Sequence, residues 1–135
     1  MTWSQLAKAY GLTFLVFLAV DFFWLGIVAK KLYQRQLGHL FSPEVNWAAA
    51  FLFYVIFVLG LMVFVIHPAV KSGAAVQAVW MGALFGLVTY ATFDLTNLAL
   101  VKGWPIPIVV VDILWGIVLS AIVSTAGYGI TRWLS

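Results

Sequence analysis

Residues 46–66 read NWAAAFLFYVIFVLGLMVFVI and contain no charged side chain. At a rise of about 1.5 Å per residue, a helix of this length spans about 30 Å, which is the thickness of the hydrocarbon core of a bilayer. Three further apolar stretches of at least this length occur at residues 6–29, 74–101 and 107–133. The sequence therefore predicts an all-α membrane protein, in which four transmembrane helices pack as a compact bundle with both termini on the same side.

The composition of the chain excludes a soluble fold. Of the 135 residues, 65% are hydrophobic and 8% are charged, whereas about 25% of the residues of soluble domains are charged. So few polar side chains cannot cover the surface of a domain of this size, and lipid must contact most of its exterior. Four spans and their connections account for the chain, so we expect residues 1–135 to form a single transmembrane domain.

The connections between the apolar stretches are marked by polar and helix-breaking residues. His67 and Pro68 are predicted to end the second stretch, and residues 102–105 (KGWP) separate the last two. Residues 30–45 repeat apolar side chains at roughly helical spacing among basic ones. They can lie as an amphipathic helix along the membrane surface or continue the first helix beyond the membrane by two turns. The candidate contacts for lipid headgroups are Lys30, Lys31, Arg35 and Lys102.

Three of the four acidic residues lie inside apolar stretches, at Asp21, Asp94 and Asp112. A carboxylate at mid-depth costs about 2.5 to 3.5 kcal/mol on insertion scales, and such residues normally face a cavity or a partner. Counted from the ends of their helices, all three lie roughly 8 to 12 Å inside the same side of the membrane. We expect one acidic layer, opening toward the side that carries Lys30 and Lys102.

Two faces of small and polar residues extend from these acids. Tyr90, Asp94 and Asn97 follow the i, i+4, i+7 spacing of one helix face, and Gly82 and Gly86 continue it as a G-x-x-x-G pattern. This pattern predicts that the face packs inward. A second stripe of mostly small residues lies on the last stretch at Asp112, Gly116, Ser120, Val123 and Gly127.

Tryptophan follows two of the acids at the same spacing, Trp24 after Asp21 and Trp115 after Asp112. The candidate ligand- or proton-binding residues are therefore Asp21, Trp24, Tyr90, Asp94, Asn97, Asp112 and Trp115. A packing role is the alternative, in which each buried carboxyl bonds to an amide, a hydroxyl or an indole and ties two helices together. Hydrogen bonds of this kind between membrane helices average about 0.6 kcal/mol.

Catalysis is less favoured by the sequence than binding. The absence of cysteine excludes disulfides and thiolate chemistry. Histidine boxes, tandem aspartate motifs and a G-x-S-x-G nucleophile are also absent, although three aspartates and Asn97 could ligate Mg²⁺ near the interface. We expect no cofactor. Nucleic acid is not needed as a partner, because the basic residues lie near helix ends where anionic headgroups attract them.

Several segments together resemble the DUF2177 family of small bacterial membrane proteins. They are residues 21–26 (DFFWLG) with the following Tyr33, residues 94–99 (DLTNLA), residues 102–105 (KGWP) and residues 112–116 (DILWG). The resemblance spans nearly the whole chain and implies a four-span protein of the bacterial cytoplasmic membrane with no agreed reaction. Members of the family often accompany genes for lipid modification, so the resemblance also implies a lipid-linked role.

Three functions stay open at this point. The first is a carrier or channel-like protein whose acidic layer binds a proton, a cation or an amphiphilic, lipid-like ligand. The second is an accessory subunit that docks a larger membrane protein through its glycine stripes and acids, and the third is an intramembrane enzyme acting on lipid. Membrane lipid is the expected partner in each, and a homo-oligomer is favoured because four short helices enclose little volume.

Overall fold

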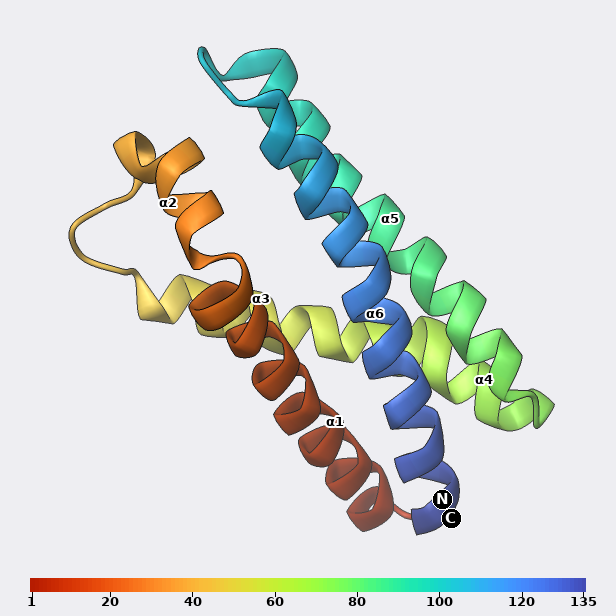
Figure 1. The fold of residues 1–135 in the computed structure, drawn as a ribbon. Helices are drawn as coiled ribbons and strands as arrows, with labels where there is room; N and C mark the ends of the chain where they lie inside the picture. Colours follow the sequence, from red (N-terminus) through yellow and green to blue (C-terminus); the bar gives the residue numbers. More distant parts are fainter.

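Four long apolar helical segments make up most of the chain, and no strand is present (Figure 1). The structure is a computed structural model that describes residues 1–135. Each segment is long and apolar enough to cross a membrane, so the prediction of an all-α protein with four transmembrane helices is confirmed. The elements are α1 (Trp3–Phe23), η1 (Trp24–Val28), α2 (Lys30–Leu37), η2 (Gly38–Leu40), α3 (Trp47–Leu61), η3 (Met62–Ile66), α4 (His67–Ser72), α5 (Ala75–Leu100) and α6 (Ile106–Leu134).

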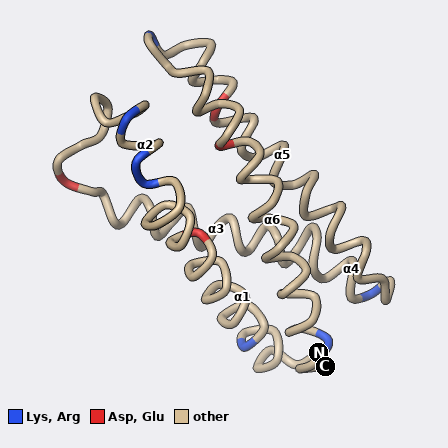
Figure 2. The backbone as a smooth tube through the Cα atoms, in the orientation of Figure 1, with Lys and Arg blue, Asp and Glu red and all other residues tan.

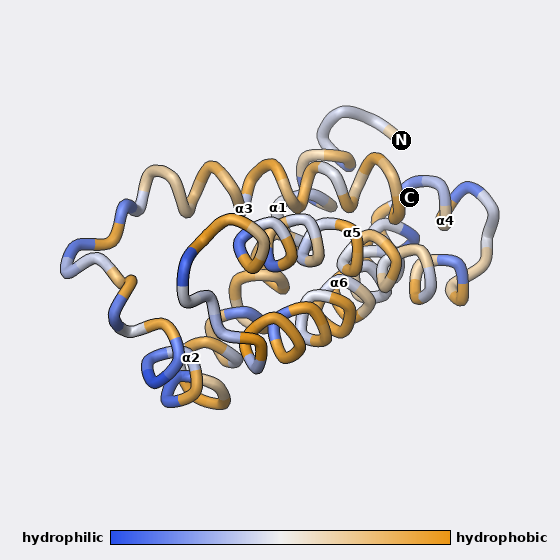
Figure 3. The backbone as a smooth tube through the Cα atoms, turned by 90° about the horizontal axis from the view of Figure 1, so that it is seen from above, coloured by the Kyte–Doolittle hydropathy of each residue, from blue (hydrophilic) through white to orange (hydrophobic).

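Three of the segments run side by side, and the fourth crosses them. α1, α6 and α5 follow one another across the molecule, whereas α3 and α4 form one long rod that passes obliquely over a common face of the three (Figures 1 and 3). The two chain ends lie together at one end of the bundle (Figure 1). There the Gln5 side-chain amide donates a hydrogen bond of 2.9 Å to the Leu134 carbonyl.

The closest helix pair is α5 with α6, and glycine makes its close approach possible. A Cβ atom at Gly82 would lie 2.6 Å from Ser124 Oγ, and one at Gly86 would lie 2.6 Å from Ser120 Oγ. Both distances are too short for any side chain, so the two stripes of small residues pack directly against each other. The prediction that the Gly82–Gly86 face packs inward is confirmed.

The second segment does not end at His67 and Pro68, as the sequence predicted, but continues through α4 to Ser72. The turn before the proline is π-helical, and the His67 N–H bonds the Met62 carbonyl. Pro68 then occupies the first turn of α4, where its missing N–H and fixed φ are tolerated. The segment ends instead at Gly73, whose φ of 77° is the left-handed conformation of a helix C-terminus.

Residues 30–45 contain the short helix α2, the turn η2 and an extended connection, and whether α2 lies along the membrane surface stays a prediction. α1 passes into the π-helical turn η1, bends at the buried Ala29 (φ −109°, ψ 4°) and resumes as α2. α2 extends past the end of α1, at the same end of the molecule as the α5–α6 connection (Figure 1). This position lets a side chain of α2 reach α6.

The outer faces of the helices are apolar, as a protein solvated by lipid requires. Hydrophobic residues follow the long helices, and hydrophilic ones gather in the connections and at the chain ends (Figure 3). Large exposed side chains such as Leu15, Phe64 and Val88 are spread over several helices. The core itself is small and lies where α1, α3 and α6 meet, around Phe17, Leu61 and Leu119.

Candidate functional site

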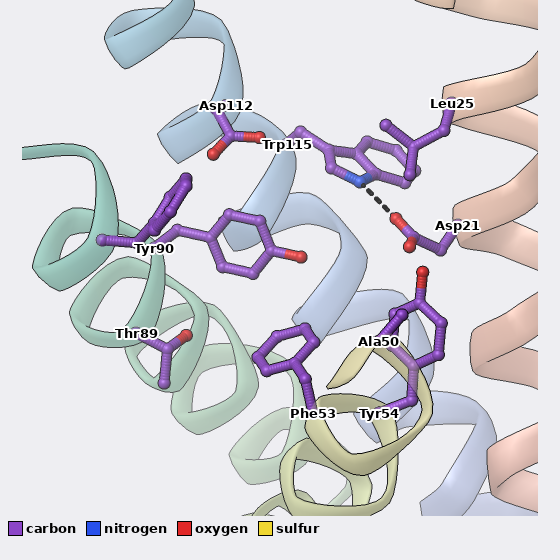
Figure 4. Close-up of a pocket in the computed structure, with 10 residues that line it drawn as sticks. Asp21, Leu25, Ala50, Phe53, Tyr54, Thr89, Tyr90, Asp112 and Trp115 are labelled. Carbon is purple, nitrogen blue, oxygen red and sulfur yellow. Dashed lines mark hydrogen bonds between the residues drawn. The ribbon is translucent and has the colours of Figure 1, made fainter. Parts of the chain in front are cut away.

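A cavity of about 360 Å³ lies between the four long helical segments, at the crossing of α3 over the other three. Seven of its ten lining residues are hydrophobic, and two are aspartates (Figure 4). The lining residues are Asp21, Leu25, Ala50, Phe53, Tyr54, Thr89, Tyr90, Phe93, Asp112 and Trp115. The cavity is therefore an apolar and aromatic pocket with carboxyl groups from two different helices.

Asp21 reaches the cavity from α1 and is held by neighbours on two other helices. Its side chain is 5% exposed. The Trp115 indole of α6 donates a hydrogen bond of 3.1 Å to Asp21 Oδ1, and the Tyr54 hydroxyl of α3 points toward the same carboxyl (Figure 4). Polar groups on α3 and α6 thus orient the carboxyl group of α1.

Asp112 is bonded by a residue of α2 that lies outside the membrane-spanning segments. The Tyr33 hydroxyl donates a hydrogen bond of 2.7 Å to Asp112 Oδ1 and accepts one of 3.3 Å from the Trp24 indole. Burial, and then the neighbouring Asp112 carboxylate, raise the pKa of the Tyr33 phenol above its usual value. Tyr33 therefore stays a neutral hydrogen-bond donor.

The two tryptophans predicted beside the acids join these two bonding networks. The Trp24 and Trp115 rings are stacked, with centroids 4.4 Å apart and planes inclined by 6°. Trp24 bonds the tyrosine that holds Asp112, while Trp115 bonds Asp21. The indole pair therefore connects both carboxyl groups of the cavity through contacts between η1, α2 and α6.

Asp94 differs from the other two acids because it has no hydrogen-bond partner. Its side chain is 0% exposed and both of its carboxyl oxygens are unpaired. The neighbouring hydroxyls that could have bonded it, on Thr92 and Thr96, donate instead to carbonyls of their own helix. The packing role, in which a buried carboxyl ties two helices together, is thus met by Asp21 and Asp112 but not by Asp94.

The predicted site residues do not all meet at one point. Tyr90 and Trp115 line the cavity with Asp21 and Asp112, and Trp24 stacks behind Trp115. Asp94 is buried outside the cavity lining, and Asn97 is half-buried with no side-chain hydrogen bond. No group of three or more His, Asp and Glu residues could hold a metal ion, so the Mg²⁺ site considered from three aspartates is not assembled.

Sequence reasoning did not include two tyrosines of this network, Tyr33 and Tyr54. Tyr33 lies in a segment with the composition of a connection, and only its place in the family resemblance marked it. Tyr54 lies on the span that carries no acid, so nothing on its own helix indicated a polar role. The crossing of α3 brings it beside Asp21.

The candidate headgroup contacts lie at one end of the molecule. Lys30, Lys31 and Arg35 are exposed on α2, and Lys102 is exposed in the connection between α5 and α6 (Figure 2). The remaining basic residues lie toward the other end, near the chain termini and on α4 (Figure 2). Contact of the first group with lipid headgroups stays a prediction.

Comparison with known proteins finds a match over nearly the whole chain. The family model described as "Predicted membrane protein (DUF2177)" matches residues 6–129. No curated protein and no solved structure matches the chain. The match agrees with a membrane protein, and its description names no ligand or reaction.

Proposed function

The chain belongs to the DUF2177 family of predicted membrane proteins, and from the geometry of its acidic cavity we propose that it binds the cationic group of an amphiphilic ligand within the membrane, as a carrier does. One observation supports this proposal above the others. A cavity of about 360 Å³ between membrane-spanning helices is lined by two carboxyl groups and several aromatic rings. Its size falls in the range of about 300 to 1,000 Å³ that is typical of small-molecule sites.

The charge of the lining favours a cation. Asp21 and Asp112 are its only charged residues, and no lysine, arginine or histidine lines it. A buried carboxylate without a counter-charge is unfavourable, and a bound cation would offset that cost. The rings of Tyr54, Tyr90 and Trp115 line the same space. Each aromatic face would add about 0.5 to 2 kcal/mol of cation–π attraction.

The exposed part of the lining favours an amphiphile over a simple inorganic ion. Leu25, Phe53 and Phe93 line the cavity and are 39%, 47% and 53% exposed. All three belong to segments long and apolar enough to cross a membrane, where an exposed side chain would face lipid. A ligand could therefore leave its apolar portion among lipid chains and extend its cationic end to the carboxyl groups.

The test is binding of tetraphenylphosphonium, a lipophilic cation, to the purified protein in detergent, measured by calorimetry. We expect Asp21→Asn and Asp112→Asn each to weaken binding by about tenfold or more, which corresponds to about 1.4 kcal/mol. Glu44→Gln is the matched control, because it removes an acid from an exposed connection. Equal affinity in wild type, both Asn variants and the control would refute the proposal.

A further inference from the structure

Asp94 is a buried carboxyl group that the proposed binding cavity does not use. It does not line the cavity, it is 0% exposed, and neither of its oxygens has a hydrogen-bond partner. An isolated carboxylate in such a place loses its hydration and gains nothing in return, so it must hold a proton or share one. The geometry around Asp94 identifies the group that could share it.

The packing of α5 against α6 places Asp112 opposite Asp94. Gly82 faces Ser124, Gly86 faces Ser120, and Tyr90 lies against Gly116. In each pair the two residue numbers add to 206. The same antiparallel register pairs Asp94 with Asp112, and Asp112 is the acid whose charge acts on the Asp94 carboxyl group.

The hydrogen bonds of Asp112 leave one of its oxygens available to Asp94. Tyr33 of α2 bonds Oδ1, and no hydrogen bond reaches Oδ2. Like charges side by side repel, so two adjacent carboxyl groups are stabilised when one proton lies between them. The other titratable groups near the pair are acids or phenols: Tyr33 on α2, Tyr90 on α5 and Asp21 on α1, with Tyr54 of α3 beside Asp21.

We propose that Asp94 and Asp112 form a proton-binding pair behind the cavity, and that a cation entering the cavity displaces the shared proton through Asp112. This inference rests on the proposed function, because Asp112 belongs to both sites. Before exchange, the pair holds two carboxyl groups and one proton. After exchange it holds two carboxylates, the cation neutralises one of them, and the proton leaves to water. The net charge of the site is the same in both states, so exchange adds no charge to the membrane interior.

The first experiment tests the pair without any ligand. Infrared spectra of the purified protein at neutral pH report the C=O stretch of a protonated carboxyl group. We expect this band in wild type and in Glu44→Gln, and its loss in Asp94→Asn. In Asp112→Asn we expect the band to shift rather than vanish, because the isolated Asp94 then holds a whole proton. A spectrum of Asp94→Asn that retains the whole band would overturn the inference.

The second experiment tests exchange. Tetraphenylphosphonium is added to wild type in weakly buffered detergent, and a pH-indicator dye records the protons released. Because one shared proton is displaced, we expect about one proton per bound cation at most, and none from Asp94→Asn, which retains the two acids of the cavity. If Asp94→Asn does not fold, loss of the wild-type infrared band on titration with tetraphenylphosphonium answers the same question.

The outcomes separate this inference from the proposed function. Binding of tetraphenylphosphonium without proton release and without change in the band would overturn exchange while leaving the cavity as a cation site. If the cation does not bind to wild type, the proposed function fails and exchange fails with it. The ligand-free spectra then still decide whether Asp94 and Asp112 share a proton.

Discussion

Replacing Gly86 with alanine should force α5 and α6 apart. The added methyl group would lie 2.6 Å from Ser120 Oγ and still closer to the backbone carbonyl of Gly116. The serine side chain can rotate away, but the carbonyl belongs to the backbone of α6 and cannot. Overpacking of this kind typically costs about 1 to 3 kcal/mol, and here relief requires movement of a whole helix.

Gly129→Ala in α6 makes the same chemical change in open space. No atom lies within 4 Å of a Cβ built at Gly129, so this variant should gain the helix propensity of alanine, about 0.8 to 1 kcal/mol. Gly86→Ala gains the same propensity in α5, so the two variants should differ in free energy of unfolding by the overpacking cost alone, about 1 to 3 kcal/mol.

The assay is reversible unfolding in mixed micelles, followed by tryptophan fluorescence and near-ultraviolet circular dichroism. Because separation of α5 and α6 would also move Asp94 away from Asp112, we expect Gly86→Ala to shift the infrared band of the protonated carboxyl group. Unfolding free energies that agree within about 0.5 kcal/mol, the usual range for neutral surface changes, would refute the packing argument.

Three further predictions concern the segment after the first helix. The raised pKa keeps the Tyr33 phenol protonated near pH 10, where ordinary tyrosines ionise. Tyr33→Phe should therefore leave the phenolate absorbance gained at that pH unchanged. A decrease in that absorbance by the contribution of one tyrosine would contradict the burial of Tyr33. Trp24→Ala removes both the stack and the bond to Tyr33, so trypsin should cleave α2 faster relative to the α5–α6 connection, and an unchanged ratio would count against docking of α2. Changing Lys30, Lys31 and Arg35 to glutamine should weaken binding of anionic lipid, measured by native mass spectrometry, by about 1 kcal/mol per residue. The same change at Lys8, Lys71 and Arg132, toward the other end, should leave lipid binding at α2 unaltered.

Span number and the inward faces could be predicted because they are local properties of each helix. Hydrophobic length alone identifies a span such as residues 46–66, and the spacing of Gly82, Gly86 and Asp94 places them on one face whatever the neighbours are. The end of the second span could not be predicted in this way. Whether Pro68 ends a helix depends on the hydrogen bonds of the preceding turn, and a π-helical turn accommodates it.

The candidate site could be predicted only in part, because residue spacing along one helix does not show which side chains other elements bring to it. Residue spacing indicated the acids and the indoles that follow them, but Tyr33 and Tyr54 join Asp112 and Asp21 from other elements. Their positions depend on the bend at Ala29 and on the oblique crossing of α3.

The sequence by itself determined that the chain spans the membrane with four helices and that three carboxyl groups lie inside them, because burial in lipid depends on composition and length. The tertiary structure decided how those carboxyl groups are used. Register between α5 and α6 sets Asp94 opposite Asp112, and helix crossing opens a cavity between Asp21 and Asp112. Register and crossing angle arise from contacts between helices distant in the sequence, which the periodicity of a single helix does not contain.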